Sequence, residues 1–350
     1  MSKVFSGIRP SGKLHLGNYL GAIKNWIELQ HNAEQAIFGV VDLHGITTPY
    51  DPAAYQEQVM DAVMDFLAAG VDPSKSLLVR QSHIPQHTEL MWLFSTITPV
   101  GWLERLPNYR EKVQQVEAAS GERAKSYQNN FGLLSYPVLM AADILIYKSN
   151  LVPVGEDQLL HLNLTNEIGA KFNHLFPGRL PGQGTGGETF EPVKPHLTEG
   201  ARIMSLQDPS KKMSKTPSAG SGQAADHYIA LTDDPDTIRT KIKKAVTDSG
   251  KDIKYDEKEK PAIANLLTIY HLLSGRAITD LEKEYAGKTY VQFKEDLAEV
   301  IVEFLRPFQE KYTELKKNPD HVQQILRDSE EKARVIAEAN LTDIRHKMGL

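Results

Sequence analysis

The chain lacks several features, and each absence excludes a class of protein. Its 350 residues include no cysteine, which excludes disulfide bonds, thiolate-held zinc, iron–sulfur clusters and a thiol nucleophile. No run approaches the roughly 18 to 20 apolar residues that a membrane helix needs, so we expect no membrane partner. The first residues contain no apolar signal segment with a cleavage site, and we therefore expect a cytoplasmic location.

Positive charge is not in excess either. Aspartate and glutamate (45) outnumber lysine and arginine (40), which gives a formal net charge of −5. A protein that binds nucleic acid through its overall charge would be basic, so any RNA partner must contact local basic patches. The length suggests two domains.

The first hundred residues alternate short apolar runs with amphipathic stretches. Residues 4–8, 36–44 and 76–82 predict buried strands. Helical spacing of apolar residues predicts a helix around 20–27, and Asp51-Pro52 indicates the start of another. Strands that are apolar on both faces and alternate with helices indicate a parallel, Rossmann-like sheet. Ligands of such sheets lie beyond the carboxyl ends of the strands.

The rest of the chain departs from this alternation. Residues 109–130 are polar and predict a mobile insertion, and the glycine-rich stretches 181–192 and 216–226 predict flexible loops. From about residue 224 onward the pattern is helical. We therefore expect an α/β domain over residues 1–217, followed by an α-helical domain over residues 218–350.

The loop after the first predicted strand, RPSGKLHLGN at residues 9–18, precedes a helix. Backbone N–H groups and the helix dipole at such a position favour an anion such as phosphate. Gly12 and Gly17 allow a ligand to approach the backbone closely, and His15 and Asn18 can both donate to phosphate oxygens. The sequence predicts a phosphate site here; a surface turn with a solvated His15 is the alternative.

Two glycine patterns resemble nucleotide-binding motifs but fail on closer inspection. Residues 7–14 (GIRPSGKL) fit most of the P-loop pattern, but Leu14 has no hydroxyl group to hold Mg²⁺. Residues 182–187 (GQGTGG) match GxGxxG, but Pro192 and Pro195 follow and exclude the helix that this motif requires. We interpret the second pattern as a flexible loop.

The segment SKKMSKT at residues 210–216 places three lysines among small residues. It predicts a mobile cationic clamp, and a solvated run of charges is the alternative. Its pairing with the loop at 9–18 favours the clamp.

Together the two loops carry a resemblance to a known family. His15-Leu-Gly-Asn18 is similar to the HIGH motif and Lys212-Met-Ser-Lys-Thr216 to KMSKS, the two signatures of class I aminoacyl-tRNA synthetases. Further segments look like bacterial tryptophanyl-tRNA synthetases, namely residues 5–12 (FSGIRPSG), 139–145 (LMAADIL), 152–158 (VPVGEDQ), 245–249 (AVTDS) and 260–267 (KPAIANLL).

The resemblance implies a two-step reaction that uses ATP and Mg²⁺. The carboxylate of the amino acid attacks the α-phosphate of Mg·ATP, and the aminoacyl group then passes to the terminal ribose of tRNA. Because the amino acid is itself the nucleophile, catalysis comes from positioning and from cations. The residues implied to be catalytic are His15, Asn18, Lys112, Lys212 and Lys215. Those implied to bind ATP are Arg9, Pro10, Ser11, Gly17, Asn18, Gly155, Glu156, Asp157, Ile203, Lys212, Met213, Ser214, Lys215 and Thr216.

The resemblance also implies a tryptophan pocket with Asp143 as its selective residue. Indole offers one polar group, an N–H donor, so its pocket needs one acceptor in an apolar setting. Asp143 lies among apolar residues of a predicted helix; an exposed or helix-capping aspartate is the alternative. The other residues implied to bind substrate are Phe5, Gly7, His44, Tyr136, Met140, Val152, Val154 and Gln158.

The implied partners are L-tryptophan, tRNA(Trp) and a second copy of the chain in a homodimer. Residues 1–217 would be the catalytic domain and residues 218–350 the tRNA (anticodon)-binding domain. Two lysine and arginine clusters are candidates for tRNA contact, with solvated helix faces as the alternative: Lys241, Lys243 and Lys244, and Arg327, Lys332 and Arg334.

Some positions depart from the family pattern. Thr216 replaces the last serine of KMSKS and keeps the hydroxyl group, so we expect little change. The polar segment that contains Lys112 is longer than usual, and residues 181–192 look like an insertion.

Three other interpretations are open. A tyrosyl-tRNA synthetase would need a pocket matched to a phenol, and MAADIL and VGEDQ favour indole. A small-molecule adenylyltransferase can carry an HxGH-type loop, but the KMSKT segment and the large helical region argue against it. A non-catalytic paralogue that binds RNA would be free to lose the loop residues, whereas His15, Asn18, Lys212 and Lys215 are all present.

Overall fold

The computed structural model describes the chain except for residues 1, 11, 107–129, 178–187, 198–202 and 214–223. Its sheet consists of β1 (Lys3–Ile8), β2 (Gln35–Val40), β3 (Leu77–Arg80), β4 (Leu151–Val154) and β5 (Lys194–Leu197). The strand order is β3-β2-β1-β4-β5, and every pairing is parallel. This confirms the predicted Rossmann-like sheet.

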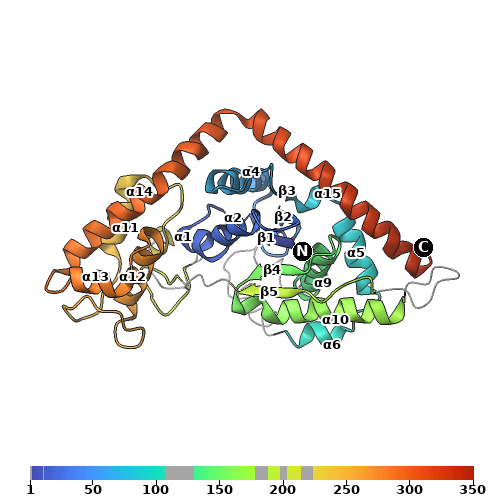
Figure 1. The fold of residues 1–350 in the computed structure, drawn as a ribbon, viewed down its shortest axis with the longest axis horizontal. Helices are drawn as coiled ribbons and strands as arrows, with labels where there is room; N and C mark the ends of the chain where they lie inside the picture. The colour runs from blue at the N-terminus through green and yellow to red at the C-terminus, as the bar shows by residue number, and fades with distance from the viewer. Residues whose placement is uncertain (1, 11, 107–129, 178–187, 198–202, 214–223) are drawn as a thin grey trace.

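The described helices share the chain order of Figure 1. They are α1 (Leu16–Asn18), the π-helix η1 (Tyr19–Ile23), α2 (Lys24–Leu29), α3 (Asp42–Gly45), α4 (Pro52–Ala69), η2 (Gln81–His83), α5 (Gln86–Ser95), α6 (Val100–Glu104), α9 (Phe131–Leu145), η3 (Glu156–Gln158), α10 (Leu159–Leu175), η4 (Ala224–His227), α11 (Pro235–Lys244), α12 (Pro261–Ser274), α13 (Ile278–Glu284), α14 (Tyr290–Lys317) and α15 (Pro319–Met348).

The two faces of the sheet carry separate apolar cores. On one face Val4 and Phe38 pack with α2 and α4, and the Trp26 ring stacks on Phe38 with centroids 4.7 Å apart. On the other face Phe5 and Ile37 pack with α5, α9 and α10. Because consecutive strand residues point to opposite faces, the continuous apolar runs of the sequence supply both cores.

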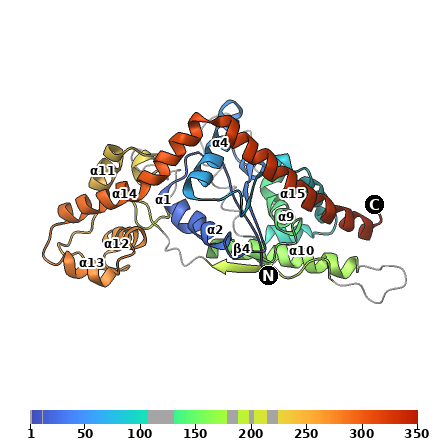
Figure 2. The same cartoon turned by 45° about the horizontal axis from the view of Figure 1, so that its top comes forward.

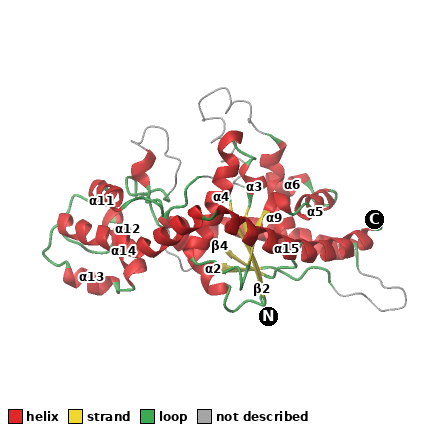
Figure 3. Cartoon of the chain, turned by 90° about the horizontal axis from the view of Figure 1, so that it is seen from above, coloured by secondary structure: helices red, strands yellow, loops and turns green. Residues whose placement is uncertain are grey.

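The helical second half divides in two. Helices α11 and α12 pack against α14, and α13 packs on α12, in a group that lies to one side of the sheet (Figure 3). Helices α14 and α15 meet above α4, and α15 then descends beside the sheet (Figures 1 and 2). There α15 packs against β3 and α5, and its Ala333, Ala337 and Leu341 join the core of the α9 face. The last helix of the predicted second domain therefore contacts the sheet.

The prediction of one strand over residues 36–44 was too long. β2 ends at Val40, and Asp42–Gly45 forms the short helix α3. The Asp42 carboxylate accepts hydrogen bonds from the backbone N–H groups of Leu43 and Ser82, which turns the chain at the edge of the sheet. This turn places His44 over the carboxyl ends of the strands.

The predicted insertion at 109–130 falls outside the described residues except for Asn130, and most of the stretches at 181–192 and 216–226 also lies outside them.

Candidate active site

The predicted site residues gather at the carboxyl ends of β1 and β4. These central strands lie side by side, and the strand order reverses there, which is where ligands bind in this class of sheet. The loop after β1 leads to α1, and the turn after β4 leads through η3 to α10. One point of the sheet therefore receives both the first predicted loop and the VGEDQ segment.

His15 and Asn18 hold each other at the start of α1. The Asn18 backbone N–H donates to His15 Nδ1 at 3.3 Å, and the His15 backbone N–H donates to Asn18 Oδ1 at 3.2 Å. This is a reciprocal capping box with histidine and asparagine in the two roles. His15 is buried, so the alternative of a solvated His15 is wrong.

The HLGN and KMSKT segments meet in the structure. A Cβ atom on Gly17 would lie 3.4 Å from Met213 Cβ and 3.1 Å from His15 Nδ1. Met213 donates its backbone N–H to the Ile203 carbonyl group at 2.9 Å, and Lys212 pairs with Met204 in an isolated bridge. Met213 and Ile203 are buried, whereas Lys212 is exposed. The structure thus brings Gly17, Ile203 and Met213 together, as the two motifs predict.

Several predicted residues cannot be placed from the described part of the chain. Ser11, Lys112, Ser214, Lys215 and Thr216 lie outside the described residues. Among those described, Pro10 is buried and Arg9 is exposed.

Asp143 is the centre of a buried polar cluster. Its Oδ1 accepts from Gln81 Nε2 at 2.7 Å and from His87 Nδ1 at 2.6 Å, and its Oδ2 accepts from His44 Nε2 at 2.8 Å. His87 Nε2 in turn contacts the Tyr147 hydroxyl group at 2.8 Å. Asp143 is 2% exposed and lies inside α9, so the alternative of an exposed or capping aspartate is wrong.

The ionised form of Asp143 is favoured by its neighbours. Burial raises the pKa of a carboxyl group, but the hydrogen bonds from His44 and His87 and the charges of both rings lower it further, so the pKa of Asp143 falls below its ordinary value. The site therefore keeps a buried carboxylate that only accepts hydrogen bonds.

The predicted apolar pocket residues surround this cluster. Phe5, Val152 and Val154 belong to one buried core, and Met140 packs against it. The Phe5 ring stacks on the Tyr147 ring with centroids 5.7 Å apart. The structure therefore brings the apolar residues of the predicted tryptophan pocket together beside the Asp143 network.

Tyr136 connects this pocket to the first loop. Its ring lies edge-on to the His44 ring, and its hydroxyl group contacts His161 Nε2 at 2.6 Å. Burial raises the pKa of Tyr136 to about 12, partly offset by the positive charge of Arg9. Arg9 is thus close enough to influence the pocket electrostatically, and Tyr136 stays a neutral hydroxyl group near pH 7.

Close backbone approaches constrain two predicted glycines. A Cβ atom on Gly7 would lie 2.5 Å from Val41 Cγ1, and one on Gly155 would lie 2.7 Å from Asp157 Oδ1. Asp157 and Glu156 are exposed, and Gln158 Nε2 donates to Asp157 Oδ2 at 2.7 Å. Side chains larger than hydrogen would displace either turn.

Gln81, His87 and Tyr147 bind Asp143 or its partners, and none of them was predicted. One signal was available for Gln81, because a polar residue directly after the apolar strand LLVR lies at the carboxyl end of a parallel sheet. His87 lies on a helix whose sequence does not indicate which side chain faces the site.

The lysine cluster on α11 is not a uniform basic surface. Lys241 is 6% exposed and its Nζ lies 2.5 Å from Asp233 Oδ2, so the prediction that it faces solvent is wrong. Lys243 is exposed, and Lys244 pairs with Asp226 at 3.0 Å.

A family described as tRNA synthetases class I (W and Y) matches residues 1–306, and the chain belongs to this family. Within it, the chain groups with the tryptophan–tRNA ligases. The tryptophan–tRNA ligase of Helicobacter pylori is 44% identical over 349 residues and the second tryptophan–tRNA ligase of Streptomyces avermitilis is 43% identical over 349. These alignments cover 99% of this chain and 98% and 96% of the relatives.

Solved structures agree with this assignment. Tryptophanyl-tRNA synthetase from Mycoplasma pneumoniae has a TM-score of 0.84 at 32% identity and covers 100% of this chain and 98% of its own. The Campylobacter jejuni enzyme, complexed with ADP and tryptophan, has a TM-score of 0.79 at 32% identity and covers 99% of this chain and 100% of its own. A tyrosyl-tRNA synthetase from Aeropyrum pernix, at 18% identity and a TM-score of 0.61, shares the fold.

Proposed function

We propose that this chain activates L-tryptophan with ATP to form tryptophanyl-AMP and pyrophosphate, and then transfers tryptophan to the 3′ end of tRNA(Trp). The observation that carries this proposal is the state of Asp143. It is a buried carboxylate, held ionised, beside an apolar pocket at the carboxyl ends of the strands.

The hydrogen bonds of Asp143 fit one further donor. An ionised carboxylate has about four lone-pair positions. Gln81 and His87 use Oδ1, and His44 approaches Oδ2. Among the described residues, one acceptor position on Oδ2 is left, and the indole N–H would take it. A site that pairs a substrate N–H rejects an analogue without it by about 10⁴- to 10⁵-fold, because the buried acceptor is then unpaired.

Activation needs no protein nucleophile, since the carboxylate of tryptophan attacks the α-phosphate. The attacking oxygen forms the new P–O bond while the bond to the β-phosphate oxygen breaks, and pyrophosphate leaves. His15, Gly17 and Asn18 would hold the nucleotide at the start of α1, with Met213 and Ile203 against the adenine. Lys212 and Lys215, and Lys112 from the polar insertion, would stabilise the charge that develops on the leaving pyrophosphate.

The remaining predicted contacts complete the two substrate sites. Arg9, Pro10, Ser11, Ser214 and Thr216 would contact ATP. Gly155, Glu156 and Asp157 would bind the ribose from the turn after β4. Gln158 and Tyr136 would orient tryptophan, with Gly7 leaving room for its backbone.

Magnesium would enter with the substrate as Mg·ATP. The described residues contain no group of three or more His, Cys, Asp or Glu side chains that could hold a metal ion. Mg²⁺ is commonly held largely by substrate phosphates and water, so no dedicated protein cage is required.

The helical half would bind the anticodon region of tRNA, as part of a domain over residues 218–350 that follows a catalytic domain over residues 1–217. Within the two candidate clusters, exposed Lys243 is a better candidate than buried Lys241. Net charge does not attract RNA here, so contact would depend on such local sites.

A homodimer is supported by exposed apolar side chains on neighbouring helices. Trp92 on α5, Val100 on α6, Phe131 on α9 and Leu160 on α10 are 70%, 59%, 72% and 48% exposed. Exposed apolar side chains that gather on one surface mark interaction sites. We expect a dimer in sedimentation velocity; a monomer at micromolar concentration would contradict this part of the proposal. No helix in the described part of the chain is long and apolar enough to cross a membrane, and a cytoplasmic location is part of the proposal.

ATP–pyrophosphate exchange without tRNA, measured with each of the twenty amino acids, tests the proposal. We expect exchange with tryptophan alone. Exchange with tyrosine instead would contradict the role of Asp143, and no exchange with any amino acid would favour an RNA-binding paralogue.

A further inference from the structure

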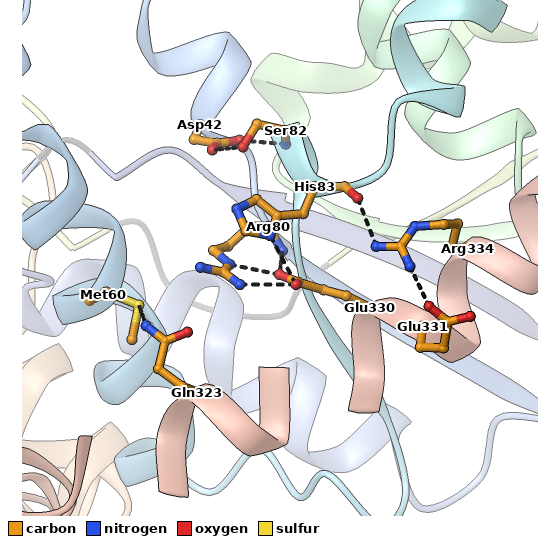
Figure 4. Close-up of polar contacts among 9 residues, drawn as sticks. All are labelled: Asp42, Met60, Arg80, Ser82, His83, Gln323, Glu330, Glu331 and Arg334. Carbon is orange, nitrogen blue, oxygen red and sulfur yellow. Dashed lines mark hydrogen bonds and ion pairs between the residues drawn. The ribbon is translucent and has the colours of Figure 1, made fainter. Parts of the chain in front are cut away.

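One carboxylate on the C-terminal helix holds both ends of the turn after β3. Glu330 of α15 accepts from three groups of Arg80, namely the backbone N–H at 3.2 Å, Nε at 2.7 Å and Nη2 at 2.9 Å. The other end of the turn, His83, places its Nδ1 at 3.0 Å from Glu330 Oε2. Figure 4 shows the carboxylate between these two side chains. Arg334, one helical turn further along α15, adds a hydrogen bond to the His83 carbonyl group at 3.2 Å.

The residues inside this turn belong to the amino-acid pocket. Gln81 donates to Asp143 Oδ1, and its own carbonyl oxygen accepts from the backbone N–H groups of Leu43 and His44. Ser82 donates to Asp42, at the start of α3. The turn therefore fixes a donor on Asp143 and the backbone that carries His44, the second donor.

Burial makes this arrangement strict. Arg80 is 7% exposed and Glu330 is 3% exposed, and a two-bond pair between guanidinium and carboxylate permits few geometries. Such a buried pair is weak evidence for a net gain in stability, because both charges lose their hydration. Its geometric effect is to fix the backbone at residues 80 and 83, between which Gln81 has little freedom to move.

We propose that Glu330 is a positioning residue for tryptophan recognition, acting through Arg80 and His83 to hold the Gln81 amide group on Asp143. The Gln81 bond occupies one lone pair of Oδ1 and so determines which acceptor position is left for the indole N–H. It follows that α15, which continues from the helical half, is mechanically connected to the amino-acid pocket. This inference rests on the proposed function, because it assumes that Asp143 receives the indole.

Glu330→Gln in the full-length chain tests the inference. The amide keeps the volume but replaces one acceptor oxygen with an NH₂ group, which must face a donor of Arg80 or His83. In ATP–pyrophosphate exchange we expect the KM for tryptophan to rise roughly 10- to 100-fold, as for displaced positioning groups, while the KM for ATP is unchanged. An unchanged KM for tryptophan, or an equal rise for both substrates, would overturn the inference.

Glu89→Gln is the matched control. Glu89 on α5 makes a two-bond pair with Arg345 of α15, with both distances 2.6 Å, so it also joins α15 to the sheet half. Its bonds do not lead to Asp143. We expect this variant to keep the wild-type KM for tryptophan. A rise equal to that of Glu330→Gln would show that loose docking of α15, rather than the turn, is responsible, and would overturn the inference.

A second variant and a double mutant separate position from general stability. His83 is half-exposed, so His83→Gln should fold, and we expect a smaller rise in the KM for tryptophan. In a Gln81→Ala background, Glu330→Gln should add little, since both act through the same amide group. Additive effects would overturn the inference. Wild-type exchange with tryptophan is measured first, so failure of the proposed function shows as no exchange, whereas failure of the inference leaves that exchange intact.

Discussion

The Cβ atom that Gly17 lacks would lie 3.4 Å from the Cβ atom of Met213. This contact joins the loop after β1 to the lysine-bearing segment near the end of the sheet half. The segment after it reinforces the junction, because Leu16 donates its N–H to the Ile229 carbonyl group and Leu231 donates to that of Leu14. The two motifs of the nucleotide site are thus in contact before any ligand binds.

Gly17→Ala should therefore impair nucleotide use without unfolding the protein. The added methyl group would lie 3.1 Å from His15 Nδ1, so the imidazole must move. We expect kcat/KM for ATP in pyrophosphate exchange to fall about 10- to 100-fold, the scale of a misplaced positioning group. Gly21→Ala is the control, because its Cβ atom would meet nothing within 4 Å. Equal losses in both variants would argue against a specific contact at Gly17.

Asp143→Asn should reduce stability in a pH-dependent way. At pH 7 we expect a loss of about 1–3 kcal/mol in the free energy of unfolding, because buried donors lose an acceptor. The folded-state pKa of Asp143 is lowered, chiefly against the effect of burial, by the hydrogen bonds from His44 and His87. Its contribution is therefore fully present above the unfolded-state pKa of about 3.9 and is lost as the pH falls through the lower folded value.

Urea unfolding of the wild type and of Asp143→Asn checks this dependence. The difference in unfolding free energy should be constant near neutral pH and should shrink below about pH 4. A difference that stays constant through the acid range would mean that the Asp143 carboxylate is not held ionised by the fold.

Lys241→Met and Lys243→Met should separate stability from RNA contact. Lys241 is buried, and its partner Asp233 also accepts from the backbone N–H of Ala230, which pairs with His15. Removing Lys241 leaves a buried carboxylate without its charge partner, and we expect a loss of about 3–5 kcal/mol. Lys243 is exposed, so its variant should keep its stability and bind tRNA more weakly. Thermal unfolding and a filter-binding titration measure the two effects.

The sheet and its ligand edge could be predicted because they depend on local patterns. The apolar run at residues 4–8 became β1 within one residue, and the last helix, expected at 320–348, is Pro319–Met348. The strand at 36–44 was predicted too long because residues 41–44 are also apolar or neutral, and only the Asp42 contacts with Ser82 show that the chain turns there.

The partners of Asp143 could not be predicted for a different reason. Gln81, His87 and Glu330 are brought together by tertiary packing between elements up to 250 positions apart in the chain. A lone sequence carries no signal for such pairs. The same holds for Lys241, whose place in a lysine run suggests solvent although Asp233 buries it.

The central claim is that Asp143 recognises the indole N–H, and an analogue without that group tests it most directly. In 3-(benzothiophen-3-yl)alanine, sulfur replaces the N–H with little change of shape. We predict that kcat/KM in pyrophosphate exchange falls about 10⁴-fold from tryptophan to this analogue in the wild type, and that Asp143→Ala reduces this ratio to near unity. Equal use of both substrates by the wild type would contradict the account.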